Sequence, residues 1–385
     1  MPEQPAHHDV LVLGLGGMGT AALAHLAARG LSAVGVEQDD VPSLWGSSVG
    51  ETRVIRKAYL EDARYVPLLV RAYALWRELE ERERASLYVR TGCLVLGPRD
   101  HAAVRGTKAS AEQHGLLHSV LAEDEVRARL ALVPAPGDEG VFEEDAGFLR
   151  VEACTAAHAR WAKASGATLR TRTRVTELDL GGGKVRATLE GGERLTADKL
   201  VVSAGAWLAS APGLAEIARD VPLVVERQAQ LWFRSKAREA TRPPALPVFI
   251  HFTGAGTFYG LPPDEAHEAP AVKVCRHHGG TLTQADALDR VVHDEDEAPV
   301  RRYVHAHLPA ADGERVRARI CMYTNTPDEH FLVGAHPRWP HVVVLGGFSG
   351  HGYKMASVMG EIAADLVATG TSRFDLGMFR VGRFG

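Results

Sequence analysis

The sequence has few cysteines, no long apolar run and no large excess of charge of either sign. Its 385 residues include four scattered cysteines, Cys93, Cys154, Cys275 and Cys321, with no Cys-x-x-Cys spacing. This pattern excludes a disulfide scaffold and argues against a thiolate metal cluster. The longest apolar runs are interrupted by glycine, histidine or arginine, so no segment can span a bilayer. The formal net charge of −4 gives no reason to expect nucleic acid or an anionic membrane as a partner.

The composition that is present is that of an ordinary globular protein. Hydrophobic residues make up 45% of the chain and charged residues 24%. The length allows a large core and two lobes. The polar start "MPEQPAHHDV" leads directly into a predicted strand, which is not the pattern of a secretory signal. We therefore expect a soluble cytoplasmic protein.

The first fifty residues contain a dinucleotide-binding pattern. In "DVLVLGLGGMGTAALAHLAARGLSAVGVEQ", we predict strands over 10–13 and 33–36 and a helix over 20–29. Gly14, Gly16 and Gly19 form a G-x-G-x-x-G motif at the turn before the helix. These glycines allow a tight turn, approach of the backbone to a pyrophosphate and close packing of the helix on the strand.

The motif has two further features that favour a dinucleotide. The helix begins at the turn, so its free N–H groups and the positive end of its dipole face the phosphates. Glu37 stands 18 residues after Gly19, where it is expected to accept hydrogen bonds from a ribose. The pattern does not choose between NAD, NADP and FAD, although the acid disfavours the 2′-phosphate of NADP. The alternative is a glycine-rich turn in an α/β fold that binds no nucleotide.

The last block of the chain resembles the first. "HVVVLGGFSGHGYKMASVMGEIAADLVATG" predicts a strand, a glycine-rich turn and a helix. The buried strand over 342–345 needs a parallel neighbour, so this block is expected beside the opening one. We predict an α/β fold with a discontinuous Rossmann-like nucleotide-binding lobe and a mixed-sheet α+β substrate lobe. The first lobe comprises 1–84, 146–219 and 321–385, and the second comprises 85–145 and 220–320.

Six motifs together indicate a known family. They are the glycine fingerprint, "SSVGETRVIRKAY", "VVSAGAW", "KVCRHHGG", "CMYTNTPDEHF" and "GGFSGHGYKMA". In their order and spacing the chain resembles the monomeric sarcosine oxidase and N-methyltryptophan oxidase family of flavin amine oxidases, over essentially its whole length. The cysteine block and the glycine-rich C-terminal block are highly specific, and the fingerprint is less so. The resemblance implies that the nucleotide is FAD and that the protein is a monomer.

Cys321 is the residue to which the resemblance gives the most unusual role. It implies that the sulfur is bonded to the 8α-methyl carbon of FAD. That carbon becomes electrophilic when negative charge is held at the N1/C2=O edge of the ring, and a helix beginning near Gly350, with Lys354 in its first turn, is expected to stabilise that charge. A thiolate also needs positive surroundings. The residues alone favour a different interpretation of Cys321, that of a small buried hydrophobe, which is the usual environment of a free cysteine.

The resemblance also implies the residues around the flavin ring. Arg56 and Lys354 match a pair that binds the substrate carboxylate, for which the fork of arginine is well suited. Arg53 matches a residue beside the ring. From the residues alone, both arginines are ordinary surface charges.

Lys273 matches a lysine that activates oxygen by stabilising developing superoxide. His277, four residues further on the same strand face, matches a histidine that influences the proton of the amine. Tyr259 and His351 are expected to line the pocket. The remaining cofactor contacts that the resemblance implies are Ser47, Val175, Ala204, Gly205, Trp207, Met322, Gly347, Gly350 and Gly352.

Two departures from the family bear on the substrate. Val49 stands where the family often has histidine, which removes a polar group near the ring. The loop over 260–272 is longer than usual and is expected to border the substrate entrance. The other histidines, among them His278, are expected on the surface, and no histidine has metal-ligand spacing.

We therefore predict an FAD-dependent oxidase of a secondary amino acid of the sarcosine or N-methyl type. Hydride passes from the carbon beside nitrogen to flavin N5, and O2 is reduced to H2O2. One alternative is an oxidase of a cyclic imino acid such as pipecolate or proline in a biosynthetic pathway. An NAD-dependent dehydrogenase is opposed by the second glycine-rich helix start. A nucleotide sensor without catalysis would have no need of Lys273.

Overall fold

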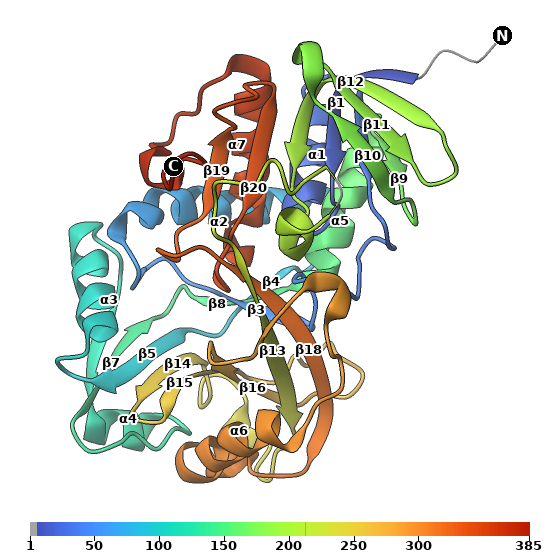
Figure 1. The fold of residues 1–385 in the computed structure, drawn as a ribbon. Helices are drawn as coiled ribbons and strands as arrows, with labels where there is room; N and C mark the ends of the chain where they lie inside the picture. The colour runs from blue at the N-terminus through green and yellow to red at the C-terminus, as the bar shows by residue number, and fades with distance from the viewer. Residues whose placement is uncertain (1–5, 212) are drawn as a thin grey trace.

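The computed structural model describes residues 6–211 and 213–385, and its strands form three β-sheets (Figure 1). An eight-stranded sheet occupies one half of the molecule and a nine-stranded sheet the other half, with a three-stranded sheet between them. The mixture of parallel sheet, antiparallel sheet and helices confirms the predicted α/β class. The seven α-helices in the described residues are α1 (Gly17–Ala28), α2 (Val66–Glu83), α3 (Ala102–Gln113), α4 (Glu123–Arg129), α5 (Val151–Ala164), α6 (Asp294–His307) and α7 (Ala356–Thr369).

The eight-stranded sheet has a parallel centre. Its strands are β1 (Ala6–Leu13), β2 (Ala33–Val36), β9 (Thr168–Arg170), β10 (Val175–Asp179), β11 (Val185–Leu189), β12 (Arg194–Val202), β19 (Leu332–Ala335) and β20 (Val342–Gly346). β1 pairs in parallel with both β2 and β12, and β20 pairs in parallel with β12. Every residue of β2 and β20 is buried, as expected for parallel strands covered on both faces. The prediction that the last block lies beside the first is confirmed.

The opening βαβ unit places a helix start at the edge of this sheet. α1 begins at Gly17, directly after the glycine turn, and packs against α5 and α7. It begins three residues before the predicted position, because the second half of the glycine motif is itself helical. Gly30 closes the unit with a φ of +83°, a conformation that glycine adopts without steric cost.

The nine-stranded sheet is antiparallel except for one pair. Its strands are β5 (Cys93–Pro98), β6 (Ser119–Ala122), β7 (Asp138–Glu143), β13 (Val224–Phe233), β14 (Val248–Thr253), β15 (Gly256–Leu261), β16 (Val272–His277), β17 (Leu282–Thr283) and β18 (Arg315–Asn325). β14 and β5 form the parallel pair. β18 and β13 run beside each other over their whole lengths, with Cys321 opposite Gln228.

The two faces of β13, β16 and β18 differ in chemistry because side chains alternate along a strand. On one face, Leu231, Phe233 and Val274 pack in a hydrophobic cluster with residues of α6. The other face carries Trp232 and Lys273, which are register partners, together with Cys321. A polar, chemically reactive face therefore points away from the helix and toward the middle of the molecule.

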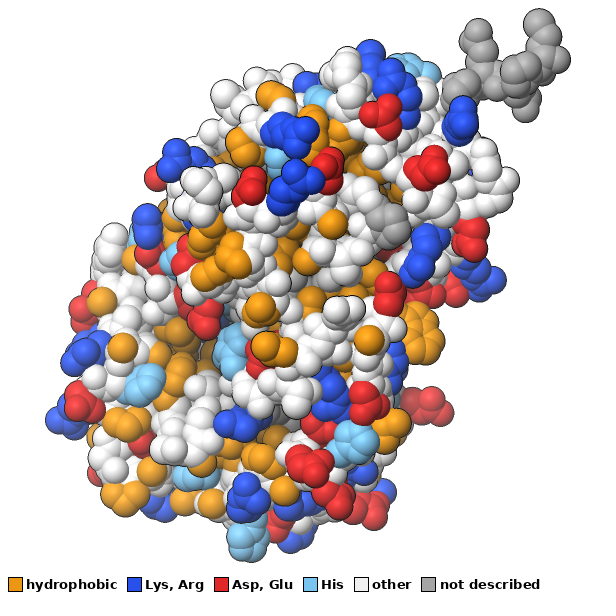
Figure 2. Space-filling view, viewed as in Figure 1, with side chains coloured by type: hydrophobic (Ala, Val, Ile, Leu, Met, Phe, Trp, Pro, Cys, Tyr) orange, Lys and Arg blue, Asp and Glu red, His pale blue; other side chains and the backbone are white. Residues whose placement is uncertain are grey.

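The third sheet joins the halves through β3 (Thr52–Ile55), β4 (Tyr88–Arg90) and β8 (Gly147–Arg150). The predicted boundary at residue 321 falls inside β18, so Cys321 and Met322 belong to a strand of the nine-stranded sheet. The division into lobes stays a prediction. No helix among the described residues is long and apolar enough to cross a membrane. Basic and acidic side chains intermingle on the face drawn in Figure 2.

Candidate active site

A pocket opens at the carboxyl ends of the central parallel strands, where the glycine turn forms one wall. Gly14 has a φ of +90°, and a Cβ there would lie 2.7 Å from the carbonyl oxygen of Ser203. A Cβ on Gly19 would lie 1.8 Å from the carbonyl oxygen of Gly14, so the helix can pack only with glycine at that position. A Cβ on Gly16 would meet only Ser48 Oγ, at 3.6 Å, which leaves this backbone open toward the pocket. The turn therefore presents backbone, not side chains, to whatever the pocket holds.

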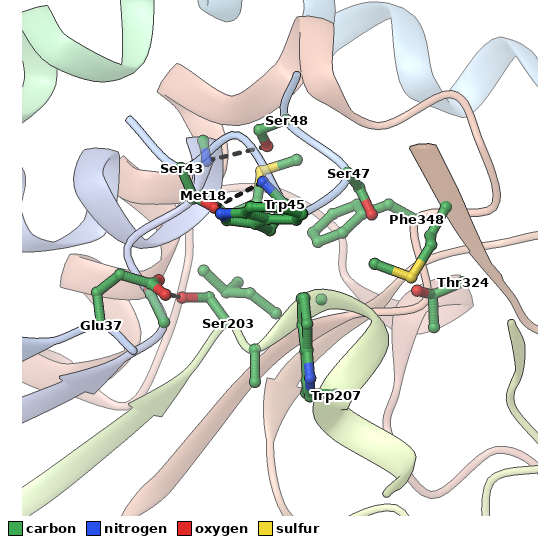
Figure 3. A pocket seen from close by; sticks show the side chains of 18 of the residues that line it. Met18, Glu37, Ser43, Trp45, Ser47, Ser48, Ser203, Trp207, Thr324 and Phe348 are labelled. Atoms are coloured by element: carbon green, nitrogen blue, oxygen red, sulfur yellow. Dashed lines mark hydrogen bonds between the residues drawn. The ribbon is translucent and has the colours of Figure 1, made fainter. Parts of the chain in front are cut away.

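Glu37 lies at one end of the pocket and is held by the backbone (Figure 3). Its Oε2 accepts from Leu15 N at 2.7 Å and its Oε1 accepts from Asp39 N at 3.1 Å. Burial raises the pKa of Glu37, and these two hydrogen bonds oppose that shift. Each carboxylate oxygen retains a second lone pair with which to accept from a ribose hydroxyl.

Two tryptophans lie on opposite sides of the pocket (Figure 3). Trp207 donates from Nε1 to Asp286 Oδ1 at 2.7 Å. Arg290 lies over the Trp45 ring at 4.6 Å and donates to the Trp45 carbonyl oxygen at 2.9 Å. The sequence predicted Trp207 but not Trp45, because nothing in its spacing separates it from a surface aromatic. Asp286 and Arg290 follow β17, so one short segment fixes both walls.

Most of the predicted cofactor contacts line this pocket, and three do not. Gly19 packs inside the βαβ unit, and Cys321 and Lys354 are buried behind the pocket wall. The predicted residues that line the pocket are Gly14, Gly16, Glu37, Ser47, Arg53, Val175, Ala204, Gly205, Trp207, Met322, Gly347, Gly350 and Gly352. An exposed glycine backbone, a helix start without a side-chain cap and a fixed carboxylate fit the pyrophosphate and ribose of a dinucleotide.

The segment over 47–53 lies against the polar face of the nine-stranded sheet and is folded around Arg53. The guanidinium of Arg53 donates to the carbonyl oxygens of Ser47 at 3.0 Å, Val49 at 2.6 Å and Thr52 at 3.0 Å. Lys273, which is 1% exposed, donates from Nζ to the carbonyl oxygen of Gly50 at 2.7 Å. A half-buried cation that lines the pocket and a fully buried one are thus held by the same short segment. From the residues alone, Arg53 was an ordinary surface charge.

Cys321 lies in this same cluster. Its side chain packs with Val49 and Tyr323 and is 1% exposed. Burial raises the pKa of the Cys321 thiol, while the charges of Arg53 and Lys273 act to lower it. Burial also lowers the pKa of Lys273 to about 8, with Arg53 as the next cause. The resemblance placed these residues together, and the strand register brings them there.

A second group of cations surrounds Tyr59, behind the glycine-rich turn at 347–352. Arg56 is 2% exposed, lies over the Tyr59 ring at 4.6 Å and forms an ion pair with Glu61 at 3.1 Å. Lys354 donates from Nζ to the His351 carbonyl oxygen at 2.5 Å and to Tyr59 Oη at 3.4 Å. The structure therefore brings together three predicted residues, Arg56, Lys354 and His351. Their partners Tyr59 and Glu61 were not predicted from the sequence.

The protonation of this group follows from burial and mutual charge. Burial, together with the charge of Arg56, lowers the pKa of Lys354 to about 7. Burial alone would raise the pKa of Glu61, but Arg56, His351 and Lys354 lower it to about 2. At neutral pH the cations of this cluster therefore face one ionised carboxylate, that of Glu61, which is part of the protein itself.

His277 and Tyr259 lie at the far end of the polar face. His277 Nδ1 is 3.2 Å from Tyr323 Oη, and the Tyr259 and His277 rings stand edge to face with centroids 6.1 Å apart. Burial and the neighbouring His278 lower the pKa of His277 to about 3. The imidazole is therefore neutral at physiological pH and can accept a hydrogen bond.

A comparison with protein families decides the family of this chain. Residues 9–366 match the model described as FAD dependent oxidoreductase. The chain belongs to this family. This agrees with the resemblance found in the sequence, and the exposed glycine backbone and fixed carboxylate of the pocket fit the nucleotide that the family uses.

Similar members of the FAD-dependent oxidoreductase family align over almost the whole chain. A monomeric sarcosine oxidase from Bacillus sp. (strain B-0618) is 36% identical over 98% of this chain and 96% of its own. An N-methyl-L-tryptophan oxidase from Salmonella enteritidis PT4 is 34% identical over 98% of this chain and 99% of its own. Among solved structures, the open form of NikD, an amino acid oxidase essential for nikkomycin biosynthesis, has a TM-score of 0.86 over 97% of each chain at 23% identity. At that identity the last comparison supports the fold alone.

Two local predictions for this FAD-dependent oxidoreductase are wrong. The C-terminal helix does not begin near Gly350, because Ser349 and Gly350 have φ values of +45° and +77°, outside the right-handed helical region. A 3₁₀ turn over Tyr353–Met355 carries Lys354, and α7 follows it. His278 is not a surface residue: it is half-buried, and its Nδ1 lies 3.0 Å from Glu226 Oε2.

The loop between β15 and β16 is held to its surroundings by ion pairs. Asp264 pairs with Arg150 at 2.7 Å, and Glu265 pairs with Arg242 at 2.8 Å. Whether it borders the entrance stays a prediction. Within the described residues, no group of three or more histidine, cysteine, aspartate or glutamate side chains is placed to hold a metal ion.

Proposed function

We propose that this chain oxidises a secondary amino acid of the sarcosine or N-methyl type, using FAD that is attached covalently to Cys321. The observation that carries the proposal is the pair of buried cations, Arg56 and Lys354, together with a dinucleotide pocket that is lined by Arg53 and behind which Lys273 and Cys321 are buried. Burying a cation costs free energy of folding unless an anion compensates its charge, so a site that retains two buried cations favours an anionic ligand.

The substrate carboxylate would bind between Arg56 and Lys354. Arg56 donates to Glu61, so a bound substrate carboxylate would replace Glu61 as the acceptor of the Arg56 hydrogen bond. Arginine binds carboxylates through two parallel N–H groups, and such hydrogen bonds are stronger than neutral ones. This arrangement selects substrates that carry a carboxylate near the amine.

His277 would handle the amine. An amine must lose its proton before the carbon beside it can give up a hydride, and His277 is neutral well below physiological pH. The proton of the amine would pass to solvent, and the neutral imidazole would accept a hydrogen bond from the uncharged amine N–H without placing a positive charge beside it. Tyr323 and Tyr259, which flank His277, would orient it.

Bound FAD would supply the hydride acceptor and the site of O2 reduction. Lys273 would stabilise the negative charge that develops on oxygen. At pH 7 it holds its proton, because its pKa is about 8. A preorganised cation in a dry site typically contributes two to three orders of magnitude to rate.

The Cys321 sulfur would form a bond to the 8α carbon of the flavin. The S–H bond and one methyl C–H bond break, both hydrogens leave as protons, and two electrons pass to the flavin ring. O2 then removes those electrons and becomes H2O2. The positive charges of Arg53 and Lys273 support this step, because they favour the thiolate.

The test of activity is a peroxide-coupled assay. The panel contains sarcosine, larger N-methyl amino acids, cyclic imino acids and the matching amines without a carboxylate. We expect peroxide only from substrates with a carboxylate, and Arg56→Met should raise KM at least tenfold. Arg64→Met is the matched control, because Arg64 pairs with Asp62 at the surface. Equal rates with the decarboxylated amines would refute the proposal, and a preference for cyclic substrates would favour the alternative substrate class.

The test of attachment is the mass of the denatured chain. We expect a gain equal to FAD in the wild type and no gain in Cys321→Ser, while Cys275→Ser keeps it. A wild-type chain without the added mass would refute attachment but leave the oxidase proposal standing. The relatives named monomeric lead us to propose a monomer, which sedimentation would test, and the cytoplasmic location predicted from composition stays part of this proposal.

A further inference from the structure

The side chain of Gln230 reaches the sulfur of Cys321. Gln230 lies on β13, two residues from the register partner of Cys321, so both side chains point to the same face of the sheet. Its Nε2 donates to Cys321 Sγ at 3.0 Å, and Gln230 is 1% exposed. A buried amide aimed at a buried thiol is not needed to fill an apolar core, where leucine or valine would serve better.

The orientation of this amide is set by its neighbours. Nε2 also lies 3.5 Å from the carbonyl oxygen of Val49, so two acceptors stand at this end of the side chain. At the other end, Oε1 has no hydrogen-bond partner among the described residues and lies over Gly50. A Cβ on Gly50 would be 1.7 Å from Oε1, so only glycine leaves room for the amide. Two acceptors at one end favour the N–H group there.

The cations in the cluster act on the sulfur by charge and not by contact. Arg53 donates to three backbone carbonyls, and Lys273 donates to the carbonyl oxygens of Gly50 and Thr52. The other titratable groups that act on this cluster are Cys275, Tyr259, Tyr323, Glu51 and Glu152, none of which is positively charged. Among the described residues, the hydrogen bond to Cys321 Sγ comes from Gln230.

We propose that Gln230 is a positioning residue for flavin attachment, which holds the Cys321 sulfur as a hydrogen-bonded thiolate aimed at the pocket. The inference deepens the proposed function, because it rests on attachment at Cys321. Before the S–C bond forms, the thiol must give up its proton inside a buried cluster, and burial opposes this. A donor at 3.0 Å offsets part of that cost and fixes the direction of the free lone pairs.

The test compares two glutamines on one strand. Gln230→Met keeps the length and volume of the side chain and removes the donor, and Gln230→Leu is a second variant should methionine disturb folding. Gln228→Leu is the matched control, because Gln228 is buried on the same face, stands opposite Cys321 in register and makes no hydrogen bond to its sulfur. Each full-length chain is produced without flavin, checked by circular dichroism and mixed with FAD.

Two readouts are taken from each chain. The first is the rate at which the denatured chain gains the mass of FAD. The second is the pH dependence of Cys321 alkylation by iodoacetamide in the flavin-free chain, with peptide mapping to separate the four cysteines. Hydrogen bonds to charged groups differ from those to neutral ones enough to change rates about tenfold. We expect Gln230→Met to attach FAD about tenfold more slowly and to raise the thiol pKa by about one unit.

The outcomes separate the two proposals. Normal attachment and an unchanged thiol pKa in both Gln230 variants would overturn the positioning role. Equal losses in Gln228→Leu would also overturn it, because the effect would then be one of packing. A wild-type chain that never gains the mass of FAD would refute attachment, and the alkylation profiles alone would then decide whether Gln230 stabilises the thiolate.

Discussion

The two walls of the pocket are built in different ways. The wall from the eight-stranded sheet is made of backbone: a glycine turn, a helix start and small residues that leave space. The wall from the nine-stranded sheet is made of side chains that strands far apart in sequence bring together. In the first wall, a glycine matters because it has no side chain to occupy the pocket. In the second wall, a residue matters because its side chain supplies a charge or a hydrogen-bond donor. The two should therefore fail differently when they are mutated.

The largest loss of FAD binding is expected when a side chain is added to a glycine of the backbone wall. Gly19→Ala places a Cβ 1.8 Å from the Gly14 carbonyl oxygen, so the turn must move. We expect complete loss of bound FAD, measured by absorbance after gel filtration, and a lower melting temperature. Gly254→Ala is the control, since Gly254 does not line the pocket and its added Cβ meets no atom within 4 Å. A Gly19→Ala chain that keeps FAD would show that the turn tolerates a side chain.

The next effect belongs to the side-chain wall and should leave FAD bound. Lys273→Met removes the buried cation that we propose to stabilise developing charge on oxygen. We expect reoxidation of the reduced flavin by O2 to slow about 100- to 1000-fold in stopped-flow absorbance, while reduction by substrate changes far less. Lys184→Met controls for a general loss of positive charge, because Lys184 is exposed and pairs with Asp198. If both half-reactions slow equally, Lys273 acts on the fold and not on oxygen.

A smaller effect is expected from pH. The pKa of Lys354 is lowered to about 7, so this side chain is charged below that pH and loses its charge as the pH rises. Carboxylate binding should therefore weaken with rising pH. We expect the inhibition constant of a carboxylate inhibitor without an amine to rise about tenfold between pH 6 and pH 9. Lys354→Met should give weak binding with a flat profile, and a steep profile in that variant would assign the titration elsewhere.

The smallest effect should come from removing an internal competitor. Glu61 accepts a hydrogen bond from Arg56 at 3.1 Å, so it competes with a substrate carboxylate for the Arg56 guanidinium. Glu61→Gln keeps the shape and removes the charge, so we expect KM to fall about threefold, as is typical for a partly exposed ion pair. Glu78→Gln, at an exposed pair with Arg71, is the control. A higher KM would mean that Glu61 orients Arg56 for the substrate.

The difference between the walls also explains what the sequence could predict. Glycine spacing and hydrophobic periodicity are local, and they predicted the βαβ unit, the parallel strand over 342–345 and the lining residues Gly14, Gly16 and Glu37. The other predicted lining positions came from the family resemblance. The side-chain wall depends on strand register, which the chain does not encode locally. Lys273, His277 and Cys321 were identified through family resemblance, whereas Glu61 and Gln230 were missed. Gln230 reads as one of four polar residues in the strand over Val224–Phe233 until its partner across the sheet is known.

The two tryptophans beside the pocket have a consequence for how the holoenzyme is assembled. Trp207 is tied to Asp286 and Trp45 to Arg290, so one segment of five residues, 286–290, links side chains on opposite sides of the pocket. FAD would have to bind before this segment reaches its final position, or displace the segment as it enters the pocket. If FAD is attached to Cys321 as we propose, a Cys321→Ser chain should still release FAD slowly, because the segment over 286–290 and not the sulfur would limit its escape.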